Sequence, residues 1–212
     1  MRLLRLTPVV LVAACAASAR AGIVAPGDAA LLARPATAQE QKLAAISGVL
    51  AGRRVRVRCG RTSGTDTYGF VAFSNRRPAD YTIISSRACA TLARFASRPS
   101  TYDARTCAQP TSDDPCFKSL LDATQALQTL AHESFHLWGT PAEAKAECYG
   151  MQNIWFVASR LGAPAAEAQA LGAWYWRVLY PARRTDAPAY WSAECRDRGK
   201  LDLRPASSSW PS

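Results

Sequence analysis

The chain has 212 residues, 49% of them hydrophobic, and a formal net charge of +10. This length suits one domain with a single core, and the absence of an internal repeat or a long low-complexity tract excludes a modular array. The excess of basic residues is not accompanied by a nucleic-acid-binding motif, so we expect no specific nucleic-acid partner.

Residues 1–21 resemble a secretory signal peptide. Arg2 and Arg5 precede an apolar stretch from Leu6 to Ala19, and Ala19-Arg20-Ala21 matches the small-x-small pattern of a cleavage site. The apolar stretch is too short for a lasting membrane anchor. A competing pattern, Val12-Ala13-Ala14-Cys15, resembles a lipobox and would leave Cys15 lipidated at a membrane. Both patterns predict an exported protein, either secreted or held in the cell envelope.

Residues 22–50 form an N-terminal segment that is open to interpretation as a propeptide. Residues 22–37 read as a flexible lead, and Gln39 to Leu50 as an amphipathic helix. The rest of the chain, residues 51–212, is expected to form one domain. Its first part contains three predicted strands, rich in β-branched and aromatic residues: Arg53–Cys59, Thr67–Phe73 and Tyr81–Ser85.

The first predicted strand alternates in character. Arg54, Arg56 and Arg58 alternate with Val55, Val57 and Cys59, which predicts one charged face and one buried face. A solvated face explains this pattern better than a site for anionic cell-wall polymers, membranes or nucleic acid.

The cysteine content agrees with export. Apart from Cys15, the chain has six cysteines, an even number that is typical of disulfides in an oxidising compartment. Of the fifteen possible connectivities, we expect Cys59–Cys89, Cys107–Cys116 and Cys148–Cys195.

The chain becomes helical after the strands. Asp114 and Pro115 form an N-cap and first-turn pair that opens a predicted helix over about 115–138. This helix carries the only two histidines of the chain, His132 and His136, within the pattern His-Glu-Ser-Phe-His. Residues four apart share a helix face, so both imidazoles can reach one metal ion while Glu133 leans towards the same side. The pattern predicts a hydrolytic zinc site with Glu133 as general base.

A second helix is expected to fold back on the first. Gly139-Thr140-Pro141 indicates a helix stop followed by a new start, with the second helix over about 141–161. Mirroring the chain about this turn pairs His136 with Glu143, and His132 with Glu147. Both acids are therefore expected on the face turned towards the histidines.

The segment from Glu143 to Gly150 resembles the second zinc helix of the gluzincin metallopeptidases, the thermolysin-like clan. The resemblance implies that His132, His136 and Glu143 bind the zinc ion, with Glu147 as a hydrogen-bonding partner of the first histidine. It covers about twenty residues. The short interval from His136 to Glu143 implies a compact version of the fold, and the metzincin pattern is excluded because Ala142 stands where that family has a third histidine.

Two features leave alternatives open. Thr140-Pro141-Ala142-Glu143 also fits a capping box, in which case Glu147 becomes the third ligand. The histidine that stabilises the oxyanion in thermolysin-like enzymes has no counterpart here, so a tyrosine or arginine would have to take its place. The sequence does not identify that residue.

A third helix is predicted over about 165–180, with Trp155, Trp174, Tyr175 and Trp176 assigned to the core, and the final stretch is expected to wrap the surface, held by Cys195. The expected fold is α+β: a small antiparallel or mixed sheet packed on a helical hairpin plus a third helix, stapled by disulfides. In zincins an edge strand holds an extended peptide, and Tyr81–Ser85 is the expected edge.

The expected activity is hydrolysis of a peptide, protein or peptidoglycan cross-link by zinc-activated water. The alternative is an exported binding protein that keeps a zincin scaffold without turnover. The sequence does not indicate an oligomeric state.

Overall fold

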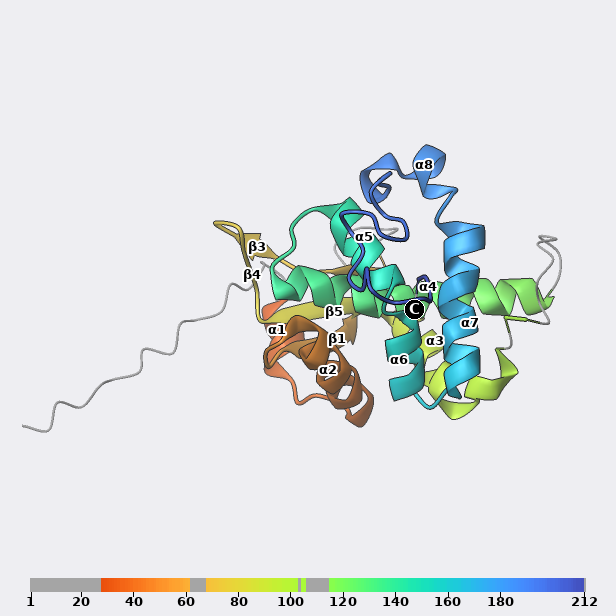
Figure 1. Ribbon diagram of the computed structural model, residues 1–212. Helices are drawn as coiled ribbons and strands as arrows, with labels where there is room; N and C mark the ends of the chain where they lie inside the picture. Colours follow the sequence, from red (N-terminus) through yellow and green to blue (C-terminus); the bar gives the residue numbers. More distant parts are fainter. Residues whose placement is uncertain (1–27, 62–67, 103, 106–114, 212) are drawn as a thin grey trace, which may run out of the picture.

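The computed structural model describes residues 28–61, 68–102, 104–105 and 115–211, and these form an α+β fold around one long helix. That helix, α4 (Pro115–Trp138), runs through the centre of the molecule (Figure 1). It has the bounds predicted from the sequence; its predicted N-cap, Asp114, lies outside the described residues. Because α4 is contacted by the central strand of the sheet and by the helices α2, α3, α5 and α6, most of its C-terminal half is buried.

The main sheet is mixed and has three strands in the order β1-β5-β2. β1 (Arg56–Gly60) is parallel to β5 (Tyr81–Ser85), and β2 (Gly69–Phe70) is antiparallel to it. The expectation that Tyr81–Ser85 is an edge strand is therefore wrong: β5 lies between two partners, and its first four residues are buried. Among the described strands, the edge on the side of α4 is β2 instead.

The predicted strand over 67–73 starts at Thr67, which lies outside the described residues; within the rest, the strand covers Gly69–Phe70, is interrupted at Val71 and Ala72, and continues in a separate hairpin. β3 (Phe73–Ser74) pairs with β4 (Arg77–Pro78), which the sequence did not predict. The turn between them has positive φ at two successive residues, Asn75 and Arg76, as tight hairpin turns require.

The N-terminal segment packs on this sheet. The expected flexible lead contains a short helix, α1 (Ala29–Ala33), with Leu32 buried, so that expectation is wrong for these five residues. The predicted helix over 39–50 is α2 (Ala38–Ala51), which begins with a capping box between Thr37 and Glu40. The buried Glu40 carboxylate also accepts the backbone N–H of Cys59 at 2.7 Å and pairs with Arg34, which joins α2 to β1.

The charged face expected on the first strand is only partly present. Val55 and Val57 are buried as predicted, but Arg58 is also buried, at 7% exposure. Its guanidinium donates to the carbonyl oxygens of Val57 and Arg34, because the N-terminal segment covers this side of β1.

Several further helices complete the fold. The remaining bounds are α3 (Ser86–Ser97), α5 (Glu143–Met151), α6 (Ile154–Arg160), α7 (Ala165–Trp174) with a π-helical extension (Tyr175–Leu179), α8 (Arg183–Asp186), and 3-10 turns at Pro99–Thr101 and Pro188–Tyr190. The sequence did not predict α3, which starts directly after β5. The prediction over 165–180 agrees with α7 and its extension.

The predicted helix over 141–161 is wrong in its continuity, since it is divided at Gln152 and Asn153. The reason is competition for backbone groups. The Asn153 side chain donates to the Tyr149 carbonyl at 2.8 Å, and Arg204 donates to the Gln152 carbonyl at 2.6 Å. Side chains that take helix carbonyls in this way interrupt the regular ladder.

One disulfide joins β1 to α3, and another joins α5 to the C-terminal segment. Cys59–Cys89 and Cys148–Cys195 are formed as predicted, and Cys107 of the third expected pair lies outside the described residues. Such bonds are typical of an oxidising, extracellular environment. Within the described ranges, no helix has both the length and the apolar character needed to cross a bilayer.

Candidate metal centre

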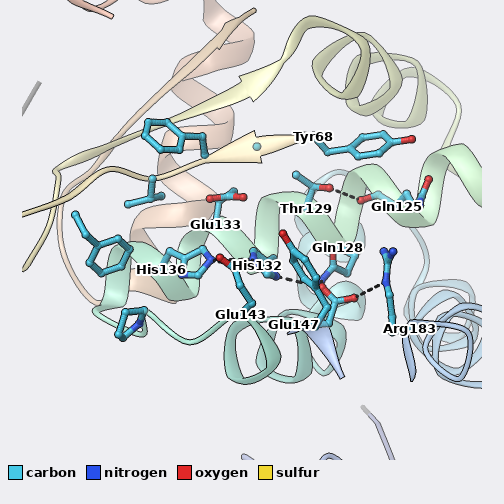
Figure 2. A pocket seen from close by; sticks show the side chains of 16 residues that line it. Tyr68, Gln125, Gln128, Thr129, His132, Glu133, His136, Glu143, Glu147 and Arg183 are labelled. Carbon is cyan, nitrogen blue, oxygen red and sulfur yellow. Dashed lines mark hydrogen bonds and ion pairs between the residues drawn. The ribbon is translucent and has the colours of Figure 1, made fainter. Parts of the chain in front are cut away.

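The two histidines of α4 and the first residue of α5 meet at one point. His132 and His136 are each 5% exposed, and their Nε2 atoms lie 2.9 Å apart. The Glu143 Oε2 atom is 3.0 Å from the first of these nitrogens and 3.2 Å from the second. Figure 2 shows the three side chains converging from the two helices, as the mirrored spacing predicted. This group could hold a metal ion.

The turn between α4 and α5 positions both helices. Gly139 has a φ of +112°, which favours glycine, and ends α4. The chain then directs the Thr140 carbonyl oxygen back to the Nδ1 atom of His136, at 2.6 Å. Further along α5, a Cβ atom on Gly150 would lie 2.8 Å from the backbone nitrogen of His132. The absence of a side chain at Gly150 thus allows α5 to approach α4 closely beside the first histidine.

The capping-box alternative for Glu143 is not supported. α5 begins at Glu143 itself, with Ala142 as its N-cap residue and no side-chain capping bond. The predicted start of this helix near Pro141 was therefore two residues early. The Glu143 carboxylate is free of the backbone and turns towards the histidines instead.

Glu147 has a different environment from Glu143, with only 2% of its side chain exposed. Its Oε2 atom accepts from His132 Nδ1 at 3.2 Å and from Gln128 Nε2 at 2.5 Å. Its Oε1 atom accepts from the Tyr175 hydroxyl at 2.5 Å and from Arg183 Nε at 3.3 Å. All of its acceptor capacity towards the protein is used, so it orients His132 rather than competing with Glu143 for an ion.

The protonation pattern of the histidines fits a bound cation. A carbonyl oxygen and a carboxylate can only accept, so the Nδ1 atoms of His136 and His132 both donate. In neutral rings each Nε2 atom then carries a lone pair, and both face each other and Glu143 Oε2. Tetrahedral zinc with Zn–N distances of about 2.0–2.1 Å would place its ligand atoms about 3.3 Å apart. The three observed separations of 2.9, 3.0 and 3.2 Å are close to this value.

The pKa shifts show how strongly negative this environment is. Burial opposes protonation of His132, but hydrogen bonds to Glu143 and Glu147 outweigh it and raise its pKa to about 10. Burial would raise the pKa of Glu143, yet its hydrogen bonds to the two histidines lower it to about 2. The same carboxylates that favour a proton on His132 also attract a divalent cation, which would take the place of that proton at Nε2.

Glu133 lies on the cavity side of α4, beside the edge strand. Burial raises its pKa, and its Oε2 atom has no hydrogen-bond partner within the part of the chain that the structure describes. A Cβ atom on Gly69 of β2 would lie 2.6 Å from Glu133 Cγ and 2.8 Å from Oε1. The carboxylate is thus held directly against the strand backbone.

Sequence reasoning missed the residues that surround the ligands from the C-terminal part of the chain. Tyr190 lines the same cavity, with its ring 5.7 Å from that of His132, and the guanidinium carbon of Arg183 lies 6.0 Å from the centre of the Tyr190 ring. Tyr175, expected to be core, is fully buried but reaches Glu147. No periodicity marks these positions. Gln128, one helical turn before His132, could have been found from its shared face.

All five residues predicted for the site, His132, Glu133, His136, Glu143 and Glu147, line one cavity. A search of protein-family models, of curated proteins and of solved structures finds no match to this chain.

Proposed function

We propose that this protein is an exported zinc-dependent hydrolase that cleaves peptide or amide bonds. The observation that carries the proposal is the convergence of two imidazole lone pairs and one carboxylate oxygen, with both Nδ1 atoms already engaged. Two imidazoles and one carboxylate form a catalytic zinc ligand set. The resemblance of the surrounding motif to gluzincin peptidases supports the same function, and the disulfides together with the signal-like residues 1–21 support export.

The metal ion and Glu133 would have different roles in hydrolysis. Zinc would supply Lewis acidity at the scissile carbonyl and lower the pKa of attacking water. Glu133 would accept the proton as the water oxygen bonds to the carbonyl carbon, and would pass it to the leaving nitrogen as the C–N bond breaks. Its buried position raises its pKa and favours this shuttling role.

Tyr190 is the candidate for the missing oxyanion residue. It lines the cavity beside His132, and its hydroxyl has no hydrogen-bond partner in the described chain. A tyrosine O–H can donate to the developing negative charge on the carbonyl oxygen.

β2 would hold the substrate in place of the strand expected from the sequence. The Tyr68 carbonyl accepts from Ser85 N–H, and the Phe70 carbonyl accepts from Thr82 Oγ1, so both residues turn their backbone oxygens towards β5. Because bonding alternates along an antiparallel pair, Gly69 and Val71 present their backbone groups to the open edge. An extended peptide could pair there, next to Glu133.

The test combines metal analysis with cleavage assays. Purified wild type and Glu133→Gln are analysed for bound zinc and incubated with peptide, protein and peptidoglycan substrates. The proposal expects one zinc per chain in both proteins and cleavage by wild type alone. Zinc without cleavage of any substrate would support the alternative of a non-catalytic exported binding protein, and protein lacking bound metal would refute the zinc-dependent hydrolase.

A further inference from the structure

The cavity around the candidate metal centre differs in character between its two ends. It encloses about 420 Å³ and extends along α4. Beside His136 the lining is apolar, with Val71, Phe73 and Pro141, and the Phe73 ring stands edge-on to His136 at 5.8 Å. At the other end, towards the start of α4, the lining is polar. Figure 2 shows this polar end, formed by Tyr68, Gln125, Gln128 and Arg183.

Arg183 is the cationic side chain at the polar end, where it is paired with the Glu147 carboxylate. It is the only arginine or lysine among the described residues that line the cavity, and 27% of its side chain is exposed. Its Nε atom donates to Glu147 and its Nη2 atom to the Tyr175 hydroxyl. A guanidinium has five N–H donors. Three therefore remain without a protein acceptor in the part of the chain described, including both on Nη1.

The neighbouring side chains add further free donors. The Gln125 amide and the Tyr68 hydroxyl have no side-chain hydrogen bond to any described residue, and both groups lie at the same end as Arg183 in Figure 2. N–H and O–H donors that line the same end of a cavity as a guanidinium suit an oxygen-rich anion better than a neutral or cationic group.

We infer that this polar end binds a carboxylate of the substrate; the inference rests on the proposed hydrolase function and names the substrate class. The carboxylate has two sources, the C-terminus of a short peptide or an acidic side chain within a longer one. The Arg183 guanidinium binds it through its unused N–H groups, while the Gln125 amide and the Tyr68 hydroxyl contribute hydrogen bonds.

The length of α4 sets the spacing between the carboxylate and the scissile bond. Gln128 precedes His132 by one turn, or about 6 Å, and Gln125 precedes it by about 10 Å. An extended peptide spans about 3.5 Å per residue. The carboxylate therefore lies about two to three residues from the bond that is cut. At the opposite end, Phe73 and Val71 accept an apolar side chain.

The experiment uses matched pairs of fluorescent peptides with the zinc-loaded Glu133→Gln protein, so that binding is measured without turnover. One pair differs only in a C-terminal acid or amide. A second series is amidated and carries Glu or Gln at each position in turn. We expect the carboxylate form of one series to bind about ten-fold to a hundred-fold more tightly, because charge-assisted hydrogen bonds are the stronger ones. A preference within the acid and amide pair identifies the peptide C-terminus as the source of the carboxylate, and a preference within the Glu and Gln series identifies an acidic side chain.

Variants then assign the preference to residues. Arg183→Gln is expected to bring the ratio of the two dissociation constants close to one, whereas Arg184→Gln, which removes the same charge from an exposed residue outside the cavity, leaves the ratio unchanged. Arg183 also contacts Glu147, so zinc content is measured for each variant. Gln125→Ala, which touches no metal ligand, is expected to reduce the ratio several-fold with zinc affinity intact.

The outcomes separate this inference from the proposed function. Suppose that wild type cleaves the carboxylate and neutral peptides of each series with equal kcat/KM, and that Glu133→Gln binds them with equal affinity. The carboxylate site is then refuted, while the hydrolase stands. If the carboxylate form binds preferentially but wild type cleaves nothing, the site stands and the hydrolase is refuted.

Discussion

Replacing Glu147 by Gln tests whether this buried acid holds the first histidine in position for an ion. The substitution keeps the shape of the side chain but removes its charge and one of its two acceptor oxygens. Four donors now converge on Glu147, from Gln128, His132, Tyr175 and Arg183. A glutamine oxygen can face only one pair of them, so the other pair meets an NH₂ group.

The expected loss follows from the role of such partners in metal sites. Removing a hydrogen-bonding partner of a ligating histidine typically weakens metal binding about ten-fold to a hundred-fold, or about 1.4–2.7 kcal/mol. Zinc affinity would be measured by competition with a chromophoric chelator. Glu143→Gln, which alters a ligand itself, should weaken binding more, and Asp186→Asn on the exposed surface should have no effect. A zinc dissociation constant for Glu147→Gln within two-fold of wild type would refute the reasoning.

Three further results are expected. Gly69→Ala should lower kcat/KM at least about ten-fold while zinc affinity stays unchanged, because the new Cβ displaces Glu133, whose role as general base is typically worth about 10²–10⁴ in rate; full activity would contradict this. Glu40→Gln should reduce the free energy of unfolding by about 2–3 kcal/mol at neutral pH. Since folding lowers the pKa of Glu40 from 4.5 to about 2, its stabilisation is complete above pH 4.5 and is lost as the pH falls towards 2, so denaturant titrations should show the two proteins converging over that range. Replacing both Cys148 and Cys195 by Ser should cost about 4 kcal/mol, from the 47-residue separation that this disulfide closes, and a thermal midpoint equal to wild type would contradict that value.

The site could be predicted from the sequence where it depends on local periodicity. The four-residue spacing of His132 and His136 and the glycine stop at Gly139 determine how α4 and α5 meet, so Glu143 and Glu147 could be placed opposite the correct histidines. Two disulfide pairs and the bounds of α4 could also be predicted. The bounds of α4 and its turn into α5 depend on residues close in sequence and on strong backbone signals, whereas the disulfide pairs, 30 and 47 residues apart, were chosen among fifteen connectivities.

The rest depends on tertiary contacts that have no local signal. The order of the strands made β5 central, although its length alone would suit an edge equally well. α6 begins a new helix because Arg204, about fifty residues later, takes the Gln152 carbonyl. Arg183 and Tyr190 reach the cavity from a proline-containing segment without periodicity, and only the folded chain brings them to the metal ligands.

The metal ligands lie earlier in the sequence than the residues that orient them, and this order affects when the site can bind an ion tightly. His132, His136 and Glu143 precede in sequence the residues that surround them. Two of the donors to Glu147, Tyr175 and Arg183, come from later in the chain. Cys195, later still, forms a disulfide with Cys148, the residue next to Glu147. A nascent or reduced chain would hold the ligands without the outer contacts that orient them. If the proposed function is correct, firm zinc uptake would be coupled to oxidation of Cys148–Cys195 and to docking of the tail, and hydrolysis would begin only once that disulfide has formed.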